Sequence, residues 1–331
     1  MTETMNAVIY TEYGSADVLK MAKMKRPTPK AKEVLIKVHA ATVSAGDVNM
    51  RGFTFVPQKM RMLVRLAFGF FKPRKPILGT VVAGEIVAIG KKVTRFKVGD
   101  SVFGMASLRL GAYAEYVCRP AEGGLALKPE GLSYEEIAAL PFGTGTALYF
   151  LKERGNLQPG QKVLVNGASG GVGNYAVQIA KSMGAEVTGV CSTRNLDMVR
   201  GLGADHVIDY TREDFTQNGE TYDLIVDTVF GKADFHRCKN SLTPEGRYCA
   251  VAGDFRETWQ SFWNKQILTG TPSENKKNME AIGELAKQGV VRPLIDRTYP
   301  LEQTSQAHEY VDTGRKRGSV IISVGEVDSG L

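Results

Sequence analysis

The sequence lacks any long apolar segment. No stretch of its 331 residues reaches the ~18 uninterrupted apolar residues of a membrane-spanning helix, and its start has no apolar core typical of a secretory signal. Cysteine is scarce, and the four cysteines, Cys118, Cys191, Cys238 and Cys249, form no C-x-x-C pair. We therefore expect a cytoplasmic protein with free thiols and no disulfide framework.

Internal repeats and low-complexity tracts are also absent, so the sequence does not indicate a solenoid or a disordered chain. Its length suits about two domains of ~100–200 residues each. The hydrophobic fraction of 43% and the charged fraction of 23% are ordinary for a globular protein. A net charge of +7 is a mild bias toward anionic ligands, and we expect no nucleic-acid partner from it.

Residues 53–76 lack acidic side chains altogether. They contain six lysines and arginines interleaved with methionine, leucine and phenylalanine. A basic amphipathic helix can make a weak contact with an anionic membrane surface. The favoured alternative is a helical insertion that packs on its own domain or covers an apolar acceptor pocket.

A glycine-rich turn dominates the middle of the chain. The apolar run 162–166 leads into Ser169-Gly170-Gly171-Val172-Gly173, and a helical pattern with one apolar face follows. Glycine permits a sharp turn and a close approach of the backbone to a ligand. The N-terminus of the following helix offers unpaired N–H groups to an anion, which suits the pyrophosphate of a dinucleotide.

Strand and helix patterns predict two kinds of domain. Short strand-like runs at 7–10, 34–40, 81–88, 101–103 and 112–117 indicate a mostly-β region. A capping box at Ser133 and Glu136 begins a helix, 141–145 should interrupt it, and strands then alternate with helices. The run 319–324 predicts a last strand that returns to the first sheet. We therefore predict an α/β fold with a doubly wound parallel sheet over 128–289 and a discontinuous mostly-β domain over 1–127 and 290–331.

The end of the second strand of the α/β domain has no acidic residue. An NAD site usually places one there, ~20 positions after the glycines, to bind the ribose 2′-hydroxyl. Instead, Ser192, Thr193, Arg194 and Asn195 stand there. Hydroxyls and a guanidinium can hydrogen-bond a 2′-phosphate. We therefore predict NADPH as the cofactor, with Ser192, Arg194 and Asn195 at its 2′-phosphate. Ser192 and Thr193 could also simply cap the next helix.

Taken together, the motifs resemble the medium-chain dehydrogenase/reductase superfamily, and within it the zinc-free quinone oxidoreductase branch. The matching segments are 79–84, 99–104, 111–116, 140–147, 160–173 and 203–210. The resemblance implies a GroES-like substrate domain, a Rossmann cofactor domain, an active site in the cleft between them and a homodimer formed through the cofactor domain. It also implies Tyr210 near the adenosine ribose, Thr146, Ala252 and Gly253 around the nicotinamide, and Arg317 closing over the cofactor.

The family's zinc ligands are not present at the matching positions. Ser44 stands for the usual cysteine, and Thr80 and Val81 stand for the usual His-Glu pair. A hydroxyl and an isopropyl group are poor zinc ligands, so we expect no metal. Hydride transfer from NADPH to an electron-poor acceptor is then the expected reaction.

The catalytic residues are the least defined part of the sequence. Members of the branch often carry Asn and Tyr where this chain has Ser44 and Asn49, and Asp47 matches an acidic position of the family. These three residues are the candidates for orienting the acceptor, although Asp47 could instead bond nearby backbone. The acceptor is a quinone or, alternatively, an enone or alkenal reduced at its C=C bond. A different class of function, an NADPH-binding protein that contacts RNA or a membrane surface, also stays open.

Overall fold

The computed structural model describes residues 3–54, 61–69, 72–107, 109–229, 234–253 and 255–325. The chain divides into two compact units. Unit 1 comprises Met1–Pro141, Glu274–Lys287 and Pro293–Leu331, and unit 2 comprises Phe142–Ser273 and Gln288–Arg292. The first domain is thus discontinuous, but residues 128–141 and 274–287 lie in unit 1, whereas the sequence analysis assigned them to the cofactor domain.

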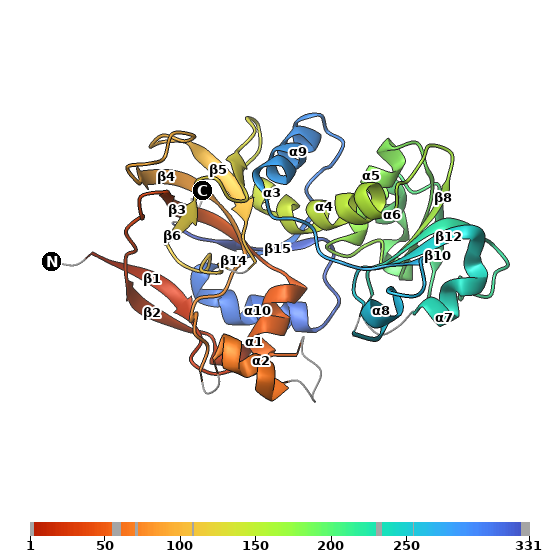
Figure 1. The fold of residues 1–331 in the computed structure, drawn as a ribbon, viewed down its shortest axis with the longest axis horizontal. Helices are drawn as coiled ribbons and strands as arrows, with labels where there is room; N and C mark the ends of the chain where they lie inside the picture. Colours follow the sequence, from red (N-terminus) through yellow and green to blue (C-terminus); the bar gives the residue numbers. More distant parts are fainter. Residues whose placement is uncertain are drawn as a thin grey trace. The chain divides into compact units, whose positions relative to one another are not determined.

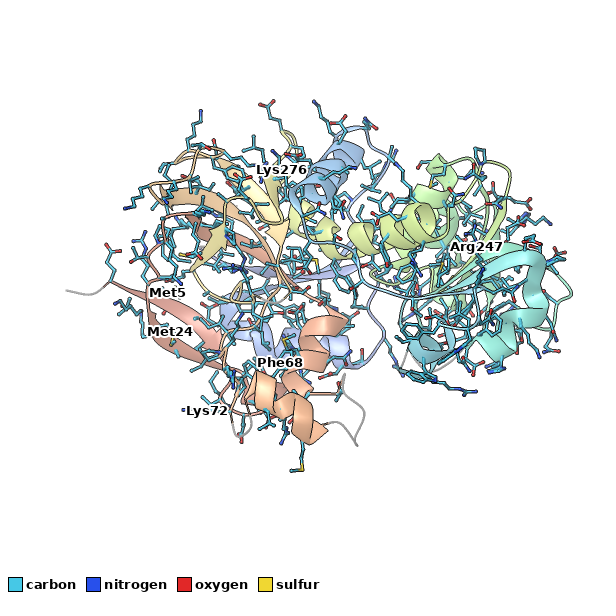
Figure 2. The ribbon with its side chains drawn as sticks, viewed as in Figure 1. Met5, Met24, Phe68, Lys72, Arg247 and Lys276 are labelled. Atoms are coloured by element: carbon cyan, nitrogen blue, oxygen red, sulfur yellow. The ribbon has the colours of Figure 1, made fainter. Side chains whose placement is uncertain are left out.

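Unit 1 is built on two sheets. In the larger sheet the strand order is β14-β15-β3-β4-β5-β7, with β6 paired to β3. The strands are β3 (Glu33–Val43), β4 (Val81–Ile89), β5 (Ser101–Met105), β6 (Tyr116–Pro120), β7 (Leu125–Leu127), β14 (Ile295–Pro300) and β15 (Ser319–Ser323). The smaller sheet pairs β1 (Thr4–Ile9) with β2 (Lys20–Lys25), where Met5 and Met24 lie opposite each other (Figure 2).

The predicted return of the C-terminal strand is confirmed. β15 pairs antiparallel with β3, so that Ile322 lies opposite Ala41. Ile322 contributes to an apolar core together with Ile36, Ile86 and Val102 from three other strands. The helical elements of this unit are η1 (Ala16–Val18), α1 (Ala45–Gly52), α2 (Arg61–Phe68), α3 (Tyr134–Ala138), α9 (Lys276–Lys287), η6 (Leu301–Gln303) and α10 (Thr304–Asp312).

Unit 2 contains the predicted parallel sheet, in the order β10-β9-β8-β11-β12-β13. Its strands are β8 (Lys162–Asn166), β9 (Glu186–Cys191), β10 (His206–Asp209), β11 (Tyr222–Asp227), β12 (Leu242–Ala250) and β13 (Ile267–Leu268). The order reverses beside β8, because β9 and β11 lie on opposite sides of it. Ligands of open α/β sheets bind at the carboxyl ends of the strands at such a switch point.

Helices flank this sheet (Figure 1). The helical elements are α4 (Leu140–Leu148), which crosses the boundary between the units, η3 (Tyr149–Arg154), α5 (Gly173–Ser182), η4 (Thr193–Asn195), α6 (Leu196–Gly201), α7 (Phe235–Cys238), η5 (Lys239–Ser241) and α8 (Phe255–Gln260). α5 packs on β8 and β9, and α6 packs on β9 and β10. The central strands are buried almost throughout, as expected of a parallel sheet covered on both faces.

Two local predictions were wrong. The predicted break at 141–145 is the middle of α4. Pro141 is tolerated because it lies in the first turn of the helix, where its missing N–H costs nothing. Gly143 is required by packing, since a Cβ there would lie 2.1 Å from the Gly171 carbonyl oxygen. The strand predicted at 112–117 lies instead at Tyr116–Pro120, because it pairs with β3 in a register that begins there.

Residues 53–76 contain the short helix α2, which packs on its own unit. The Arg65 guanidinium lies over the rings of Tyr13 and Phe53, and the Tyr13 hydroxyl donates to the Phe68 carbonyl. The predictions for Lys59, Met60, Phe70 and Phe71 lie outside the described residues. Over the parts of the chain that the structure describes, we find no helix with the length and apolarity to span a bilayer.

Candidate functional site

The glycine turn connects β8 to α5 and is held by the neighbouring strand. The N–H groups of Gly167 and Ala168 both donate to the Val190 carbonyl of β9, at 3.1 and 3.0 Å. Gly167 adopts φ +80°, and the Gly170 N–H donates back to its carbonyl oxygen at 2.9 Å. The turn is therefore closed on itself and fixed against the sheet.

The start of α5 offers several backbone donors. Val172 occupies the N-cap without a side-chain cap. Within 109–229, the N–H groups of Gly171, Val172 and Gly173 form no backbone hydrogen bond. A Cβ on Gly173 would lie 2.1 Å from the Gly167 carbonyl oxygen, so only glycine fits. The uncapped helix start suits an anion such as the pyrophosphate of a dinucleotide.

The structure brings Ser169 of this turn beside the end of β9. Asn195 Nδ2 donates to Ser169 Oγ at 3.0 Å and to Ser192 Oγ at 3.3 Å. The Asn195 side chain is buried, whereas Ser169 and Ser192 are half-buried. Ser169, Ser192 and Asn195 therefore form one cluster of polar side chains, which the sequence analysis had predicted only as separate cofactor contacts.

Arg194 and Tyr210 lie at the exposed edge of the same region. Arg194 belongs to η4 and is exposed. Tyr210 follows β10 and is 56% exposed, and its N–H donates to the Cys191 carbonyl at 3.1 Å. Both side chains come from strand ends that meet at the carboxyl edge of the sheet.

Asp209 is a carboxylate at this edge that the sequence analysis missed. It ends β10 directly beside Cys191 of β9. Hydrogen bonds from the side chain of Thr193, and from both the side chain and N–H of Thr211, lower the pKa of the Asp209 carboxyl, and Arg212 lies nearby. Asp209 could have been found from the sequence, because it follows a predicted strand and the ends of adjacent parallel strands meet. That inference requires knowing that β10 pairs with β9, which the sequence pattern does not show.

The residues predicted around the nicotinamide lie on two elements. Thr146 is buried in α4, and its hydroxyl donates to the Phe142 carbonyl at 2.7 Å. Ala252 and Gly253 follow β12 at the carboxyl edge of the sheet. Among the described residues, no hydrogen bond joins Thr146 to Ala252 or Gly253, and their shared role stays a prediction.

A second buried polar network lies at the ends of β8, β11 and β12. The Asp227 carboxylate accepts from Asn166 Nδ2 at 2.8 Å, from the Tyr248 hydroxyl at 2.6 Å and from the Val229 N–H at 3.1 Å. Burial raises the pKa of Asp227, and these three donors oppose that rise. The network fixes the loop after β11, whose Thr228 hydroxyl bonds to the Asn166 carbonyl next to the glycine turn.

The three candidate catalytic residues lie on α1 of unit 1. Ser44 is the N-cap, and its hydroxyl accepts from the Asp47 N–H while Asp47 Oδ2 accepts from the Ser44 N–H at 2.9 Å. The Ser44 hydroxyl also lies 2.6 Å from the same carboxylate oxygen. Asn49 is exposed and accepts from the Thr54 hydroxyl. Ser44 and Asp47 thus form a capping box, and a catalytic role for them stays a prediction.

Asp47 is fully buried, and this burial raises the pKa of its carboxyl to about 6. The bonds from Ser44 oppose the rise, as do the backbone amides of Gly79 and Thr80. Among the described residues, Oδ1 of Asp47 is buried and has no hydrogen-bond partner. Arg317, also in unit 1, is exposed, and its N–H donates to Asp296 at 2.8 Å.

The donor set at the family's metal position does not fit zinc. Ser44 is committed to the capping box, and Val81 has no donor atom. Among the residues that the structure describes, no three His, Cys, Asp or Glu side chains gather into a metal-binding group. Zinc-independent function stays a prediction. It is based on the poor metal-binding chemistry of these side chains.

Comparisons with known proteins agree with this architecture. Residues 30–130 match the model of an alcohol dehydrogenase GroES-like domain, and residues 202–322 match that of a zinc-binding dehydrogenase. The quinone-oxidoreductase homolog of spinach (Spinacia oleracea) chloroplasts is 33% identical over 96% of this chain and 98% of the relative. The chain belongs to the medium-chain dehydrogenase/reductase superfamily, in its quinone oxidoreductase branch.

Two further similarities support this placement. A chloroplastic NADPH-dependent alkenal/one oxidoreductase of Arabidopsis thaliana is 30% identical over 96% of this chain and 79% of the relative. The structure of the quinone oxidoreductase from Coxiella burnetii superposes with a TM-score of 0.85, at 28% identity over 98% of this chain and all of that one. This medium-chain family member is therefore an oxidoreductase that uses a pyridine nucleotide. That the turn between β8 and α5 holds this cofactor stays a prediction.

Proposed function

We propose that this protein transfers a hydride from NADPH to a quinone or a related electron-poor acceptor, without zinc. The residues at the end of β9 are the observation that supports NADPH as the cofactor. They present a hydroxyl from Ser192 and a guanidinium from Arg194, and no carboxylate of their own. A carboxylate at that point would repel a 2′-phosphate, whereas these groups form charge-assisted hydrogen bonds to one.

The nearby Asp209 does not take the place of the missing carboxylate. Its two oxygens already accept from Thr193 and Thr211, and Arg212 partly neutralises its charge. It is therefore engaged with Thr193 of η4 and with its own loop rather than presented to a ribose. This supports NADPH over NADH at the β9 end.

In this proposal, residues of the glycine turn and of the β9 end hold the cofactor. The N–H groups of Gly171, Val172 and Gly173 would hold the pyrophosphate, and Ser192 and Arg194 would hold the 2′-phosphate. The nicotinamide supplies the hydride when the cofactor is bound. The contribution of the chain is then mainly to position the two reactants, which by itself can lower a barrier substantially.

Zinc independence rests on the side chains at the metal position. Without a Lewis acid to form an alkoxide, alcohol oxidation is disfavoured, and an acceptor that is already electron-poor is favoured. The name of the spinach relative supports a quinone. The name of the Arabidopsis relative supports an enone or alkenal reduced at its C=C bond, and this is the second candidate.

Steady-state oxidation of NADPH decides between the two acceptors. We expect a panel of quinones to give higher kcat/KM values than a panel of enones and alkenals. The opposite order would replace the quinone with the enone as the acceptor class. Electron paramagnetic resonance adds a check on mechanism: hydride transfer gives no semiquinone signal during turnover, and a strong radical signal would contradict it.

A further inference from the structure

One buried amide joins the two parts of the proposed cofactor site. Asn195 Nδ2 donates to Ser169 in the turn after β8 and to Ser192 at the end of β9. These serines are far apart in the sequence, and they approach because β8 and β9 are adjacent parallel strands. Asn195 is itself fixed by its N–H, which donates to the Ser192 carbonyl at 2.8 Å.

The direction of these two bonds determines what the hydroxyls can do. An amide nitrogen has two N–H donors, and a serine hydroxyl has one O–H donor and two acceptor positions. Since Asn195 uses an acceptor position on each serine, both O–H donors stay available. Among the described residues, neither hydroxyl donates to a protein acceptor. The result is a pair of O–H donors gathered around one nitrogen.

The hydrogen bonding of Asn195 is incomplete, which argues against a role in stability alone. Its Oδ1 is buried and has no hydrogen-bond donor among the described residues. An unsatisfied buried acceptor is unfavourable, so its presence needs an explanation. Orientation of the two serines provides one, because it uses only the Nδ2 end of the amide.

We propose that Asn195 is a positioning residue that presents Ser169 and Ser192 together as donors to one phosphate, the 2′-phosphate of NADPH. This inference rests on the proposed NADPH dependence and goes beyond it, because Asn195 then touches no phosphate. It predicts that selectivity for a phosphorylated ribose depends on a buried side chain. A carboxamide at this position favours the phosphorylated ligand because it donates hydrogen bonds to the two serine hydroxyls and leaves their O–H groups for the phosphate. A carboxylate would accept from those O–H groups instead.

The test compares ligands that differ by the 2′-phosphate. Isothermal titration calorimetry with 2′,5′-ADP and 5′-AMP, and with NADPH and NADH, measures affinity without turnover. We expect Asn195→Ala to weaken 2′,5′-ADP and NADPH by about tenfold, the effect of about one hydrogen bond to a charged group. Binding of 5′-AMP and NADH should change less than about threefold, since neither carries the 2′-phosphate.

Asn195→Asp is the sharper variant. Its carboxylate has the same shape but accepts from both hydroxyls and adds a negative charge, so it should weaken NADPH more than Asn195→Ala does. Asn240→Ala, an exposed asparagine of the same unit, serves as the control and should leave every affinity unchanged. Thermal unfolding of each variant without ligand verifies that it is folded.

Two results would overturn the inference. Equal losses for the phosphorylated and unphosphorylated ligands would mean that Asn195 only shapes the turn. Unchanged affinity in Asn195→Ala would mean that the serines need no orientation. Failure of the proposed function looks different, because wild-type protein would then bind 2′,5′-ADP no better than 5′-AMP.

Discussion

At the scale of single residues, Arg194 carries the most direct test of cofactor preference. It is exposed at the end of β9, where a guanidinium can form charge-assisted hydrogen bonds to a 2′-phosphate. We expect Arg194→Ala to raise the KM for NADPH by about tenfold or more, and the KM for NADH by much less. Steady-state kinetics with both cofactors measures this.

A charge-matched control separates a local effect from a general one. Arg200 is an exposed arginine of α6 that pairs with Asp197 at 2.9 Å. Arg200→Ala should leave both KM values near those of wild type. Equal rises for NADPH and NADH in Arg194→Ala would contradict the assignment of the 2′-phosphate to this residue.

Asp47 gives a prediction about pH and stability. Because its pKa rises from 3.8 to about 6 on folding, the folded state binds a proton more tightly than the unfolded state. Stability from this group is present in full below pH 3.8 and is lost as the pH rises through about 6. Relative to Asp47→Asn, the wild-type free energy of unfolding should fall by about 2 kcal/mol between about pH 4 and about pH 6.

Urea titrations of both proteins at several pH values measure the difference. The comparison matters because buried His308, whose pKa falls to about 3, has the opposite effect on stability. Protonation of His308 is favoured by unfolding, so its contribution rises with pH between 3 and 6.5. Both proteins share that effect, and it cancels in the difference. A difference that does not change with pH would show that Asp47 titrates normally.

At the scale of elements, α4 can pack closely against the glycine turn because Gly143 has no side chain. Gly143 lies inside α4, and a Cβ there would meet the Gly171 carbonyl oxygen at 2.1 Å and the Tyr175 ring at 2.5 Å. Alanine is otherwise the better helix former. We expect Gly143→Ala to lower the free energy of unfolding by ~1–3 kcal/mol and to weaken NADPH binding.

Gly201 provides the matched control, because it is also a helical glycine but has open space around its Cα. Gly201→Ala should be neutral or should stabilise the protein by up to ~1 kcal/mol, through helix propensity alone. Chemical denaturation compares the two variants. A stabilised Gly143→Ala protein would show that α4 can move away from the turn without cost.

The elements also show where sequence patterns were sufficient. The predicted capping box of α3 is confirmed, with Ser133 and Glu136 each bonding to the backbone of the other. It could be predicted because both partners lie within one turn of helix. α4 could not be predicted, because the reason for Gly143 is the carbonyl oxygen of Gly171, 28 residues further along the chain.

At the scale of the whole molecule, the basic segment 53–76 is the candidate surface for contact with a membrane. On α2, Met62 and Leu66 are 73% and 59% exposed. Lys72, labelled in Figure 2, and Arg74 follow them along the chain. We propose a weak contact of this surface with anionic membranes. Sedimentation with vesicles that contain phosphatidylserine should therefore recover the protein at low salt.

Binding to such vesicles should fall when both Met62 and Leu66 are replaced by glutamine, and it should fall steeply with added salt. Leu127→Gln changes an equally exposed leucine elsewhere in unit 1 and is the control. Binding that is equal for neutral and anionic vesicles, or that is absent at low salt, would end the proposal. A homodimer and a cytoplasmic location stay predictions.

By itself, the sequence determined the sheet types, the position of the glycine turn and the approximate ends of the parallel strands. These follow from periodicity and from the conformational freedom of glycine, which are local properties. Only the tertiary structure placed Asn195 between Ser169 and Ser192, Asp209 beside the end of β9, and Asp227 among Asn166 and Tyr248. Each of these contacts joins neighbouring strands, and the order of strands in a sheet depends on long-range packing that no local pattern encodes.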